Sequence, residues 1–563
     1  MRRSRFGVLV VLLVGLALVA AACGSSKTSS GSGSQTGGSS TPKPGGTLVD
    51  LQNFNGAEPD HIDPALASDI QGSQPGQLVW DGLTENDYKT GQLVPSVAES
   101  WQSNPDATSW TFKVRPGVKF SNGDPVLPSS FVYAWNRVLS PKLASDVSYH
   151  ITDNLRIQGA KDVAAGRATT MSGLTADDAA MTLTVNLDAP LSFLPSVVSH
   201  LVFSPMDAKD LAHLGDDTST YEQGVMVGDG PYMMAEPWKH KDSITLVRNP
   251  NYWGGVNHHA AYMDKIVFKI GSDQDASWQA FEAGQGDTGY IPQAKFAEAK
   301  AKYAGRIADQ PSLGIYYYGF NMKDPMVGGA QNVKLRQAIA LVIDKQAIVN
   351  TIYNGSRKVS TGWTPPGIPG YQDGLDKFPN RDVNQAKQLL SQWSTDTGKK
   401  PSDLGTIKLN FGIGLGHDQI AAIIQANLKE IGIDATPDPR DGKTYFSQMR
   451  KGQGQLLRGG WIWDYVAYDN GLFPLFDSAS IGGDNLEQYS SPDFDNLIAK
   501  ARATTDENAR NAIYRQAEDL VLNKDVVAVP LNWYAGQVVW STRVHNVIQS
   551  PLQFFAYDEM WLS

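Results

Sequence analysis

The segment from Leu457 to Tyr465 carries the side chains with the clearest binding chemistry in this sequence. It reads Leu-Arg-Gly-Gly-Trp-Ile-Trp-Asp-Tyr, so Asp464 stands among aromatic residues and Arg458 precedes it by six positions. A carboxylate removed from water is costly unless a cation pairs with it. An ammonium group would do so through a charge-assisted hydrogen bond. The alternatives are that Asp464 caps a helix or pairs with a protein arginine, and that Arg458 belongs to a structural salt bridge.

The other chemistry-bearing patterns do not assemble a catalytic or metal site. Gly442-Lys443-Thr444 is similar to the end of a phosphate-binding loop, but Pro437 stands where the first glycine of that motif belongs. His258-His259 lack the carboxylate and helical spacing of common zinc sites. Asp493 and Asp495 fit a helix start better than a catalytic pair, and no Gly-x-Ser-x-Gly element accompanies them. We therefore expect no enzyme activity, no cofactor and no bound metal.

The first 23 residues predict export and membrane anchoring. Arg2, Arg3 and Arg5 precede an apolar run from Val8 to Leu18, which is followed by small residues and Cys23. This order is typical of a secretory signal, and the apolar run is too short to span a membrane. Residues 1–22 are expected to be the signal peptide, and Cys23, the only cysteine, is expected to be lipidated. Ordinary signal cleavage beside an incidental cysteine is the alternative.

Residues 23–45 are expected to form a flexible spacer, because they are almost all Ser, Gly and Thr and cannot bury a core. The full chain of 563 residues is long enough for two to four domains. Its formal net charge of −10 argues against a nucleic-acid partner. The 14 Trp and 21 Tyr residues are numerous enough to line a binding surface, although packing in the core is the alternative.

Hydrophobic periodicity beyond the spacer predicts an α/β fold. Apolar residues alternate from Ile407 to Ile413, as in a strand, and then recur at helical spacing from Ile420 to Ile431 before a second extended stretch. This order predicts a right-handed βαβ unit in a largely parallel sheet. Further helices are expected around 335–342 and 513–521, with strands at Val526–Leu531 and Trp110–Phe120.

A series of ordered motifs resembles the family 5 extracellular solute-binding proteins, the receptors of oligopeptide and dipeptide ABC importers. The motifs extend from about Gly45 to the C-terminus, and their order along the chain carries the resemblance. They are Asp63-Pro64, Trp80–Leu83, Pro95–Trp101, Trp110–Pro125, Phe131–Trp135, Gly228–Tyr232, Arg248–Gly254, Tyr316–Asn321, Val333–Ile339, Trp363–Pro366 and Ser491–Leu497.

The resemblance implies a two-lobed, periplasmic-binding-protein-like fold with a hinge and an extra subdomain. One lobe carries the extra subdomain, and the chain passes between the lobes more than once. The expected divisions are 46–80, 205–345 and 536–563 for domain Ia, 81–204 for domain Ib, and 346–535 for domain II. Such proteins close around a ligand by bending at the hinge.

The resemblance also assigns residues to the expected ligand site. It places Asp464 at the aspartate that pairs with the α-amino group of a peptide, Arg458 near a peptide carboxylate, and backbone groups of Gly460 and Ile462 along the peptide main chain. Ser68 and Ile70 align with a strand that meets the peptide from the other lobe, as an added β-strand would require. The other matching cleft positions are Asn321, Tyr149 and Tyr534, and Trp463 replaces a small residue beside Asp464.

The resemblance therefore implies a membrane-tethered, extracytoplasmic receptor, at the cell surface or in the periplasm. It would capture oligopeptides as a monomer and deliver them to the permease and ATPase subunits of an importer. A related chain could instead bind an oligosaccharide or chelated nickel, or sense peptides for signalling. Asp464 separates peptides from neutral sugars, because sugars have no ammonium group to neutralise it.

Overall fold

The structure is a computed structural model that describes residues 42–54, 58–215, 217–255, 261–271 and 273–563. The expected signal peptide, Cys23, most of the spacer and the pair His258-His259 lie outside these residues. None of the described helices combines the length and the apolar character that crossing a membrane requires.

The first of two large sheets has seven strands and mixed directions. β1 pairs in parallel with β10 and β11, and antiparallel strands complete both sides. In spatial order the strands are β12 (Ile307–Ala308), β19 (Val538–Trp540), β11 (Thr288–Tyr290), β1 (Thr47–Phe54), β10 (Lys265–Ile270), β9 (Ser243–Arg248) and β8 (Tyr232–Met234).

The second large sheet has six strands and carries the Leu457–Tyr465 segment. β13 is central and pairs antiparallel with β17 and β18, while β15 pairs in parallel with β16 and β17. The spatial order is β14 (Lys358–Val359), β18 (Ala528–Ala535), β13 (Pro311–Phe320), β17 (Leu456–Ile462), β15 (Thr406–Gly412) and β16 (Asp434–Arg440). The expectation of a largely parallel sheet is wrong, because the long returning strands β17 and β18 run against β13.

Three smaller sheets complete the strands of the described residues. The four-stranded sheet has the order β4 (Ala98–Ser103), β5 (Ser109–Val114), β7 (Thr182–Asn186) and β6 (Leu174–Asp177). It lies in the expected domain Ib. The two hairpin-like pairs are β2 (Thr84–Asn86) with β3 (Leu93–Pro95), and β20 (Val544–His545) with β21 (Trp561–Leu562).

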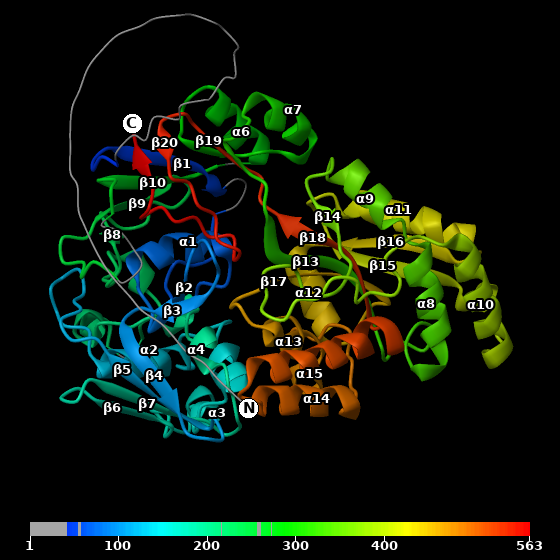
Figure 1. Cartoon of the computed structure of the whole chain (residues 1–563), viewed down its shortest axis with the longest axis horizontal. Helices are drawn as coiled ribbons and strands as arrows, with labels where there is room; N and C mark the ends of the chain where they lie inside the picture. The colour runs from blue at the N-terminus through cyan, green and yellow to red at the C-terminus, as the bar shows by residue number, and fades with distance from the viewer. Residues whose placement is uncertain (1–41, 55–57, 216, 256–260, 272) are drawn as a thin grey trace, which may run out of the picture. The chain divides into compact units, whose positions relative to one another are not determined.

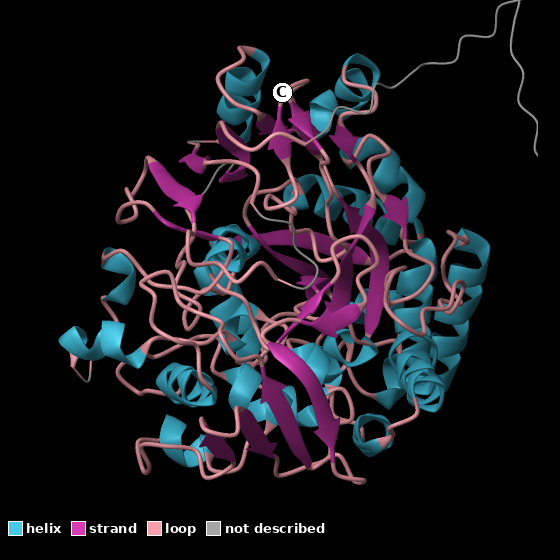
Figure 2. Cartoon of the chain, turned by 60° about the vertical axis from the view of Figure 1, so that its left-hand side comes forward, coloured by secondary structure: helices cyan, strands magenta, loops and turns pink. Residues whose placement is uncertain are grey.

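Helices flank the strands, as Figure 2 shows. Those along the first half of the chain are α1 (Ile70–Val79), α2 (Pro128–Val138), α3 (Ala160–Ala164), α4 (Leu194–Val197), α5 (Ala208–Leu211), α6 (Gln274–Glu282) and α7 (Phe296–Lys302). Those of the second half are α8 (Val333–Val342), α9 (Lys345–Ile352), α10 (Val383–Thr397), α11 (His417–Glu430), α12 (Gly442–Arg450), α13 (Phe473–Phe476), α14 (Pro492–Ala503) and α15 (Glu507–Asp519).

The predicted βαβ unit is confirmed as β15–α11–β16. Alternate residues Ile407, Leu409 and Phe411 of β15 are buried, and α11 buries Ile420 and Leu428 on one face. These side chains join one hydrophobic core with residues of α8, α9 and α10. Burial of an aliphatic or aromatic side chain contributes about 1.5–3 kcal/mol, so the two periodicities suffice to dock the helix on the sheet. The helices expected near 335–342 and 513–521 are also present as α8 and α15.

The chain passes between the two large sheets twice. One crossing joins β12 to β13 and the other joins β18 to β19 (Figure 1). The crossings lie side by side, because the backbone N–H of Gly536 donates a hydrogen bond to the carbonyl oxygen of Gln310 at 3.1 Å. A side chain at Gly536 would press against the carbonyl oxygen of Ala308, 2.8 Å from an added Cβ. Two adjacent strands of chain are the geometry expected of a hinge.

The first crossing also corrects an expected domain boundary. Residues 205–345 were assigned to domain Ia, yet β13 and α8 belong to the six-stranded sheet and its core. The boundary therefore lies between β12 and β13, because Pro311–Phe320 finds its hydrogen-bonding partners in β17 and β18.

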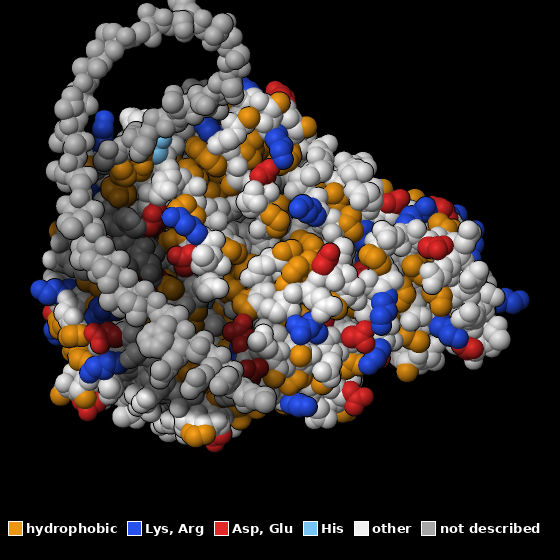
Figure 3. Space-filling view, in the orientation of Figure 1, with side chains coloured by type: hydrophobic (Ala, Val, Ile, Leu, Met, Phe, Trp, Pro, Cys, Tyr) orange, Lys and Arg blue, Asp and Glu red, His pale blue; other side chains and the backbone are white. Residues whose placement is uncertain are grey.

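The surface seen in Figure 3 carries basic and acidic side chains interspersed over the lobe that holds the six-stranded sheet. This face offers no extended basic patch of the kind that binds nucleic acid.

Candidate functional site

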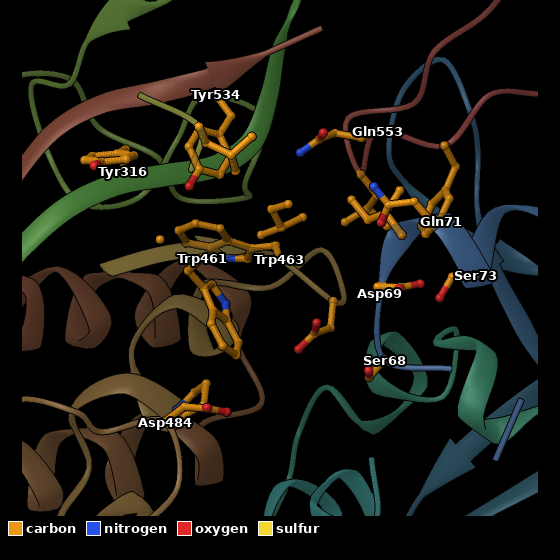
Figure 4. Close-up of a pocket in the computed structure, with 18 of the residues that line it drawn as sticks. Ser68, Asp69, Gln71, Ser73, Tyr316, Trp461, Trp463, Asp484, Tyr534 and Gln553 are labelled. Atoms are coloured by element: carbon orange, nitrogen blue, oxygen red, sulfur yellow. The ribbon is translucent and has the colours of Figure 1, made fainter. Parts of the chain in front are cut away.

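A cavity of about 1360 Å³ is lined by residues that flank both large sheets. In Figure 4, Tyr316, Trp461 and Tyr534 lie on one wall, and Ser68 and Gln553 lie on the opposite wall. Ligand sites are preferentially found between domains. This volume exceeds the 300–1000 Å³ of typical small-molecule pockets, and it is sufficient for a ligand larger than one amino acid.

Nine of the ten residues expected at the ligand site line this cavity. They are Ser68, Ile70, Tyr149, Arg458, Gly460, Ile462, Trp463, Asp464 and Tyr534. Asn321 is the exception, because it is not among the residues that line the cavity. Its side chain donates 2.8 Å hydrogen bonds to the carbonyl oxygens of Gly452 and Gly454, which holds the turn that leads into β17.

The strand expected at Ser68 and Ile70 is also absent. Ser68 lies in a loop and Ile70 is the first residue of α1. Asp69 caps this helix, because its side chain accepts a hydrogen bond from the backbone N–H of Gly72 at 2.6 Å. An aspartate directly before a helix is a common start signal, and here it overrides the expectation of an extended segment. The wall opposite β17 is therefore a loop and a helix N-terminus.

The edge of β17 is open along the cavity. β15 pairs with β17 only at Leu456 and Leu457, so Arg458–Ile462 has a strand partner on the β13 side alone among the described residues. Open edges accept an added strand. Gly460 must be small here, because an added Cβ would lie 2.3 Å from the Tyr534 hydroxyl oxygen. Gly460 thus lets β17 pass close to the tyrosine.

Asp464 follows β17 and is fixed by Asn470. The backbone N–H of Asp464 donates to Asn470 Oδ1 at 2.8 Å, and Asn470 Nδ2 donates to Asp464 Oδ2 at 3.0 Å. No Lys or Arg side chain lies within ion-pairing distance of Asp464 in the part of the chain that the structure describes. Among the described residues, its carboxylate accepts no hydrogen bond from the backbone N–H groups of a helix start either. Both alternatives considered for Asp464, a protein arginine and a helix cap, therefore lack support.

Burial raises the pKa of Asp464 to about 7. Hydrogen bonds from Asn470 and Tyr149 work in the opposite direction, and the charge of Asp484 adds to the increase. The carboxyl group therefore changes its charge close to neutral pH. An approaching cation would favour its ionised form. This is the electrostatic behaviour of a site that lacks its positive partner.

Two histidines stand beside Asp464. Ligand atoms of His150, His200 and Asp464 lie within 4.8 Å of one another, and the two imidazole rings stack with centroids 4.4 Å apart. However, His200 Nδ1 accepts the backbone N–H of Val202 at 3.2 Å, so the proton of the neutral ring is on Nε2. A metal would need a free nitrogen lone pair. The trio as placed does not meet that requirement.

The same histidines leave the charge of Asp464 uncompensated. Burial lowers the pKa of His200 to about 4 and that of His150 well below its usual value. Both rings are therefore neutral at pH 7. They contribute packing and polar edges to the cavity, and no positive charge.

Trp463 adjoins the cavity, but its side chain is only 1% exposed. An added Cβ at Gly471 would lie 2.1 Å from Cζ2 of this indole, so the ring packs against Gly471 in the core. Trp461 is half-buried and donates its Nε1–H to Asn470 Oδ1 at 3.1 Å. Trp461 thus supports the Asp464–Asn470 pair directly, whereas Trp463 packs beside it in the core.

Arg458 lies against tyrosines rather than carboxylates. Its guanidinium is 4.7 Å from the ring centroid of Tyr316, and Nη2 lies 3.4 Å from the Tyr534 hydroxyl oxygen. No carboxylate among the described residues lies within salt-bridge distance, so the structural salt bridge considered for Arg458 is not formed there. Sequence reasoning missed Asn470, the two histidines and Arg357, which also line or support this site. Only the Asp-x-x-x-x-x-Asn spacing could have suggested Asn470.

Comparison with known proteins places these observations in a family. Residues 92–483 match the model of the bacterial extracellular solute-binding proteins, family 5 Middle. The oligopeptide-binding protein OppA of Bacillus subtilis is 28% identical and aligns over 97% of each chain. Heme-binding protein A of Haemophilus influenzae is also 28% identical, over 98% of this chain and 97% of its own.

A solved structure gives the same fold. The Haemophilus influenzae OppA complex with RPPGFSPFR superposes with a TM-score of 0.75 at 25% identity, covering 93% of this chain and 100% of that chain. The architecture described above is therefore the two-lobed fold of the peptide-binding relatives. The family match covers well over half of the sequence, and the chain belongs to the family 5 bacterial extracellular solute-binding proteins.

Proposed function

We propose that this chain is the peptide-capturing receptor of an ABC importer. It holds oligopeptides in the cavity between its lobes and presents them to permease and ATPase subunits. The relatives named for oligopeptides support this assignment, while the relative named for heme shows that ligands vary within the family. The choice among ligands therefore rests on the cavity of this chain.

The observation that carries the proposal is the unneutralised carboxylate of Asp464. It lies in the cavity wall with a pKa raised to about 7 by burial. A peptide α-ammonium would supply the missing charge and donate a charge-assisted hydrogen bond. A neutral sugar carries no positive charge and would leave the ionised carboxylate without a partner.

The open edge of β17 supplies the second element of peptide recognition. In an antiparallel arrangement, alternate residues such as Gly460 and Ile462 direct their backbone groups toward the same edge. A peptide lying along that edge with its amino group at Asp464 would form main-chain hydrogen bonds that do not depend on its sequence. Arg458 would then face a carboxylate further along the peptide.

The proposed location of the receptor outside the cytoplasm depends on residues 1–45. We propose that residues 1–22 direct export, that Cys23 carries acyl chains, and that the Ser/Gly-rich spacer lets a monomeric receptor reach its permease. Each buried methylene of an acyl chain contributes about 0.8 kcal/mol, so two or more chains anchor a protein stably.

Native mass spectrometry of receptor purified from producing cells tests the proposed ligand class. We expect bound species with the masses of short peptides, which are lost from an Asp464→Asn variant purified in parallel. Retained sugars or a tetrapyrrole, in amounts unchanged by Asp464→Asn, would contradict the peptide assignment. The variant is nearly isosteric, so a circular dichroism melt should confirm that it is folded.

A further inference from the structure

A second arginine stands close to Arg458 in the same cavity. Arg357 follows α9, and its guanidinium lies over the rings of Tyr353 and Tyr534, 4.0 and 4.4 Å from their centroids. The hydroxyl group of Tyr534 is in turn 3.4 Å from Arg458 Nη2. One tyrosine side chain therefore separates two guanidinium groups, both on the side of the cavity formed by the six-stranded sheet.

Neither guanidinium has an anionic partner. No carboxylate of the described residues lies within 4.0 Å of Arg357 or Arg458. The Nε atoms of both are buried without a hydrogen-bond partner among the described residues, and Arg357 donates a hydrogen bond from Nη1 to Asn532 Oδ1 at 3.2 Å. Other arginines that flank β16 and β17 are paired, such as Arg440 with Asp438 at 2.8 Å.

The positive charges of Arg357 and Arg458 affect a neighbouring histidine. His417 shares a hydrogen bond of 3.0 Å with the hydroxyl group of Tyr316. The pKa of His417 is lowered to about 3, mainly by burial and further by the positive charges of Arg458 and Arg357. A third cation is therefore not formed here at neutral pH. Two half-buried positive charges remain, and they repel each other until an anion arrives.

We infer that Arg357 and Arg458 form a dianion subsite that selects peptides with an acidic C-terminal residue. This inference rests on the proposed peptide function. A C-terminal Glu or Asp carries two carboxylates a few bonds apart, one on the main chain and one on the side chain. Each guanidinium can bind one of them through paired N–H donors. The tyrosine faces hold both guanidiniums in place through cation–π contacts.

The position of the subsite also limits the length of the peptide. Arg458 and Asp464 are six residues apart along β17 and its extension, which is at most about 20 Å of extended chain. A bound peptide with its amino group at Asp464 spans about 3.3–3.6 Å per residue. Peptides of about three to six residues can therefore reach both ends of the site.

Isothermal titration calorimetry with matched peptides tests the inference. The series is Ala-Ala-Glu, Ala-Ala-Gln and Ala-Ala-Glu amide, each also extended by one to three N-terminal alanines. At the peptide length that binds most tightly, we expect the Glu peptide to bind about 10- to 100-fold more tightly than either analogue. Each analogue lacks one carboxylate and therefore loses one set of charge-assisted hydrogen bonds. Arg357→Gln should bring the ratio between the affinities of the Glu and Gln peptides close to one, because a single guanidinium cannot pair with both carboxylates.

Arg440→Gln is the matched control, because it removes the same charge from a paired arginine outside the cavity lining. It should keep the wild-type ratio. If the wild type binds Glu and Gln peptides equally at every length, and still requires a free amino group, the dianion subsite is wrong while the peptide function stands. If no peptide of the series binds, both proposals fail.

Discussion

Asn470 holds Asp464 through two hydrogen bonds in opposite directions, one to its backbone and one to its carboxylate. Asn470 is fully buried, and it also accepts the indole N–H of Trp461. The amide therefore fixes the position of the proposed amino anchor while leaving part of the carboxylate directed to the cavity. Its removal should change both the stability of the protein and the strength of peptide binding.

Asn470→Leu should lower the free energy of unfolding by about 1–3 kcal/mol, because buried polar groups lose their partners. Peptide affinity should fall as well, since Asp464 loses its support. Asn427→Leu is the control, because Asn427 accepts the backbone N–H of Asp344 at 2.9 Å and is not among the residues that line the cavity. Denaturant unfolding and calorimetry should show a stability loss in both variants and an affinity loss in Asn470→Leu alone. Equal affinities would contradict the positioning role.

Peptide affinity should depend on pH through Asp464. Because burial raises its pKa to about 7, the free receptor must lose a proton to bind an ammonium group below that pH. Affinity should rise from pH 5.5 to 7 by about tenfold. It should fall again above about pH 8, where the free α-amino group deprotonates. Calorimetry from pH 5.5 to 8.5 checks this, and an unchanged affinity between pH 5.5 and 7 would contradict it.

Glu487 should destabilise the fold at alkaline pH. Its side chain is fully buried against Gly319 of β13, and burial raises its pKa to about 8. The folded state then binds the proton more tightly than the unfolded state, so stability decreases as pH rises from about 4.5 to 8. Glu487→Gln should melt at a higher temperature than wild type at pH 8, with the difference vanishing near pH 4.5. The exposed Glu507→Gln serves as control, and a pH-independent difference would contradict the assignment.

Cys23 should determine whether the protein stays with the membrane. Cys23→Ser removes the only thiol of the chain, so acylation cannot occur. We expect the variant in the medium or as an unprocessed precursor in fractionated cells, whereas wild type sediments with membranes. A processed variant that remains membrane-bound would rule out the lipid anchor.

The local parts of the fold could be predicted from the sequence. The β15–α11–β16 unit follows from two periodicities within about 35 residues, and a short motif in the strand β17 and the residues after it indicated Arg458 and Asp464. The pairing of β13 with β17 and β18 could not be predicted, because its partners lie more than a hundred residues away along the chain.

The same reason explains the site residues that were missed or misplaced. Arg357 contacts Tyr353 four residues earlier, but only the tertiary fold brings it to Tyr534 of β18 and so to Arg458. Asn321 lies outside the cavity lining because its side chain holds a turn, and the segment at Ile70 is a helix instead of a strand because Asp69 caps its start. The role of a polar residue that forms such hydrogen bonds can be assigned only when its partners are known.

Binding of the peptide α-amino group by Asp464 is tested most directly by calorimetry on a thermodynamic cycle in which the receptor and the peptide are each changed. The cycle combines wild type and Asp464→Asn with one peptide in free and N-acetylated forms. Either single change should weaken binding by about a hundred- to several-thousand-fold, and the second change should add little, because both remove the same interaction. Equal binding of free and acetylated peptide to wild type would contradict the amino-anchor account.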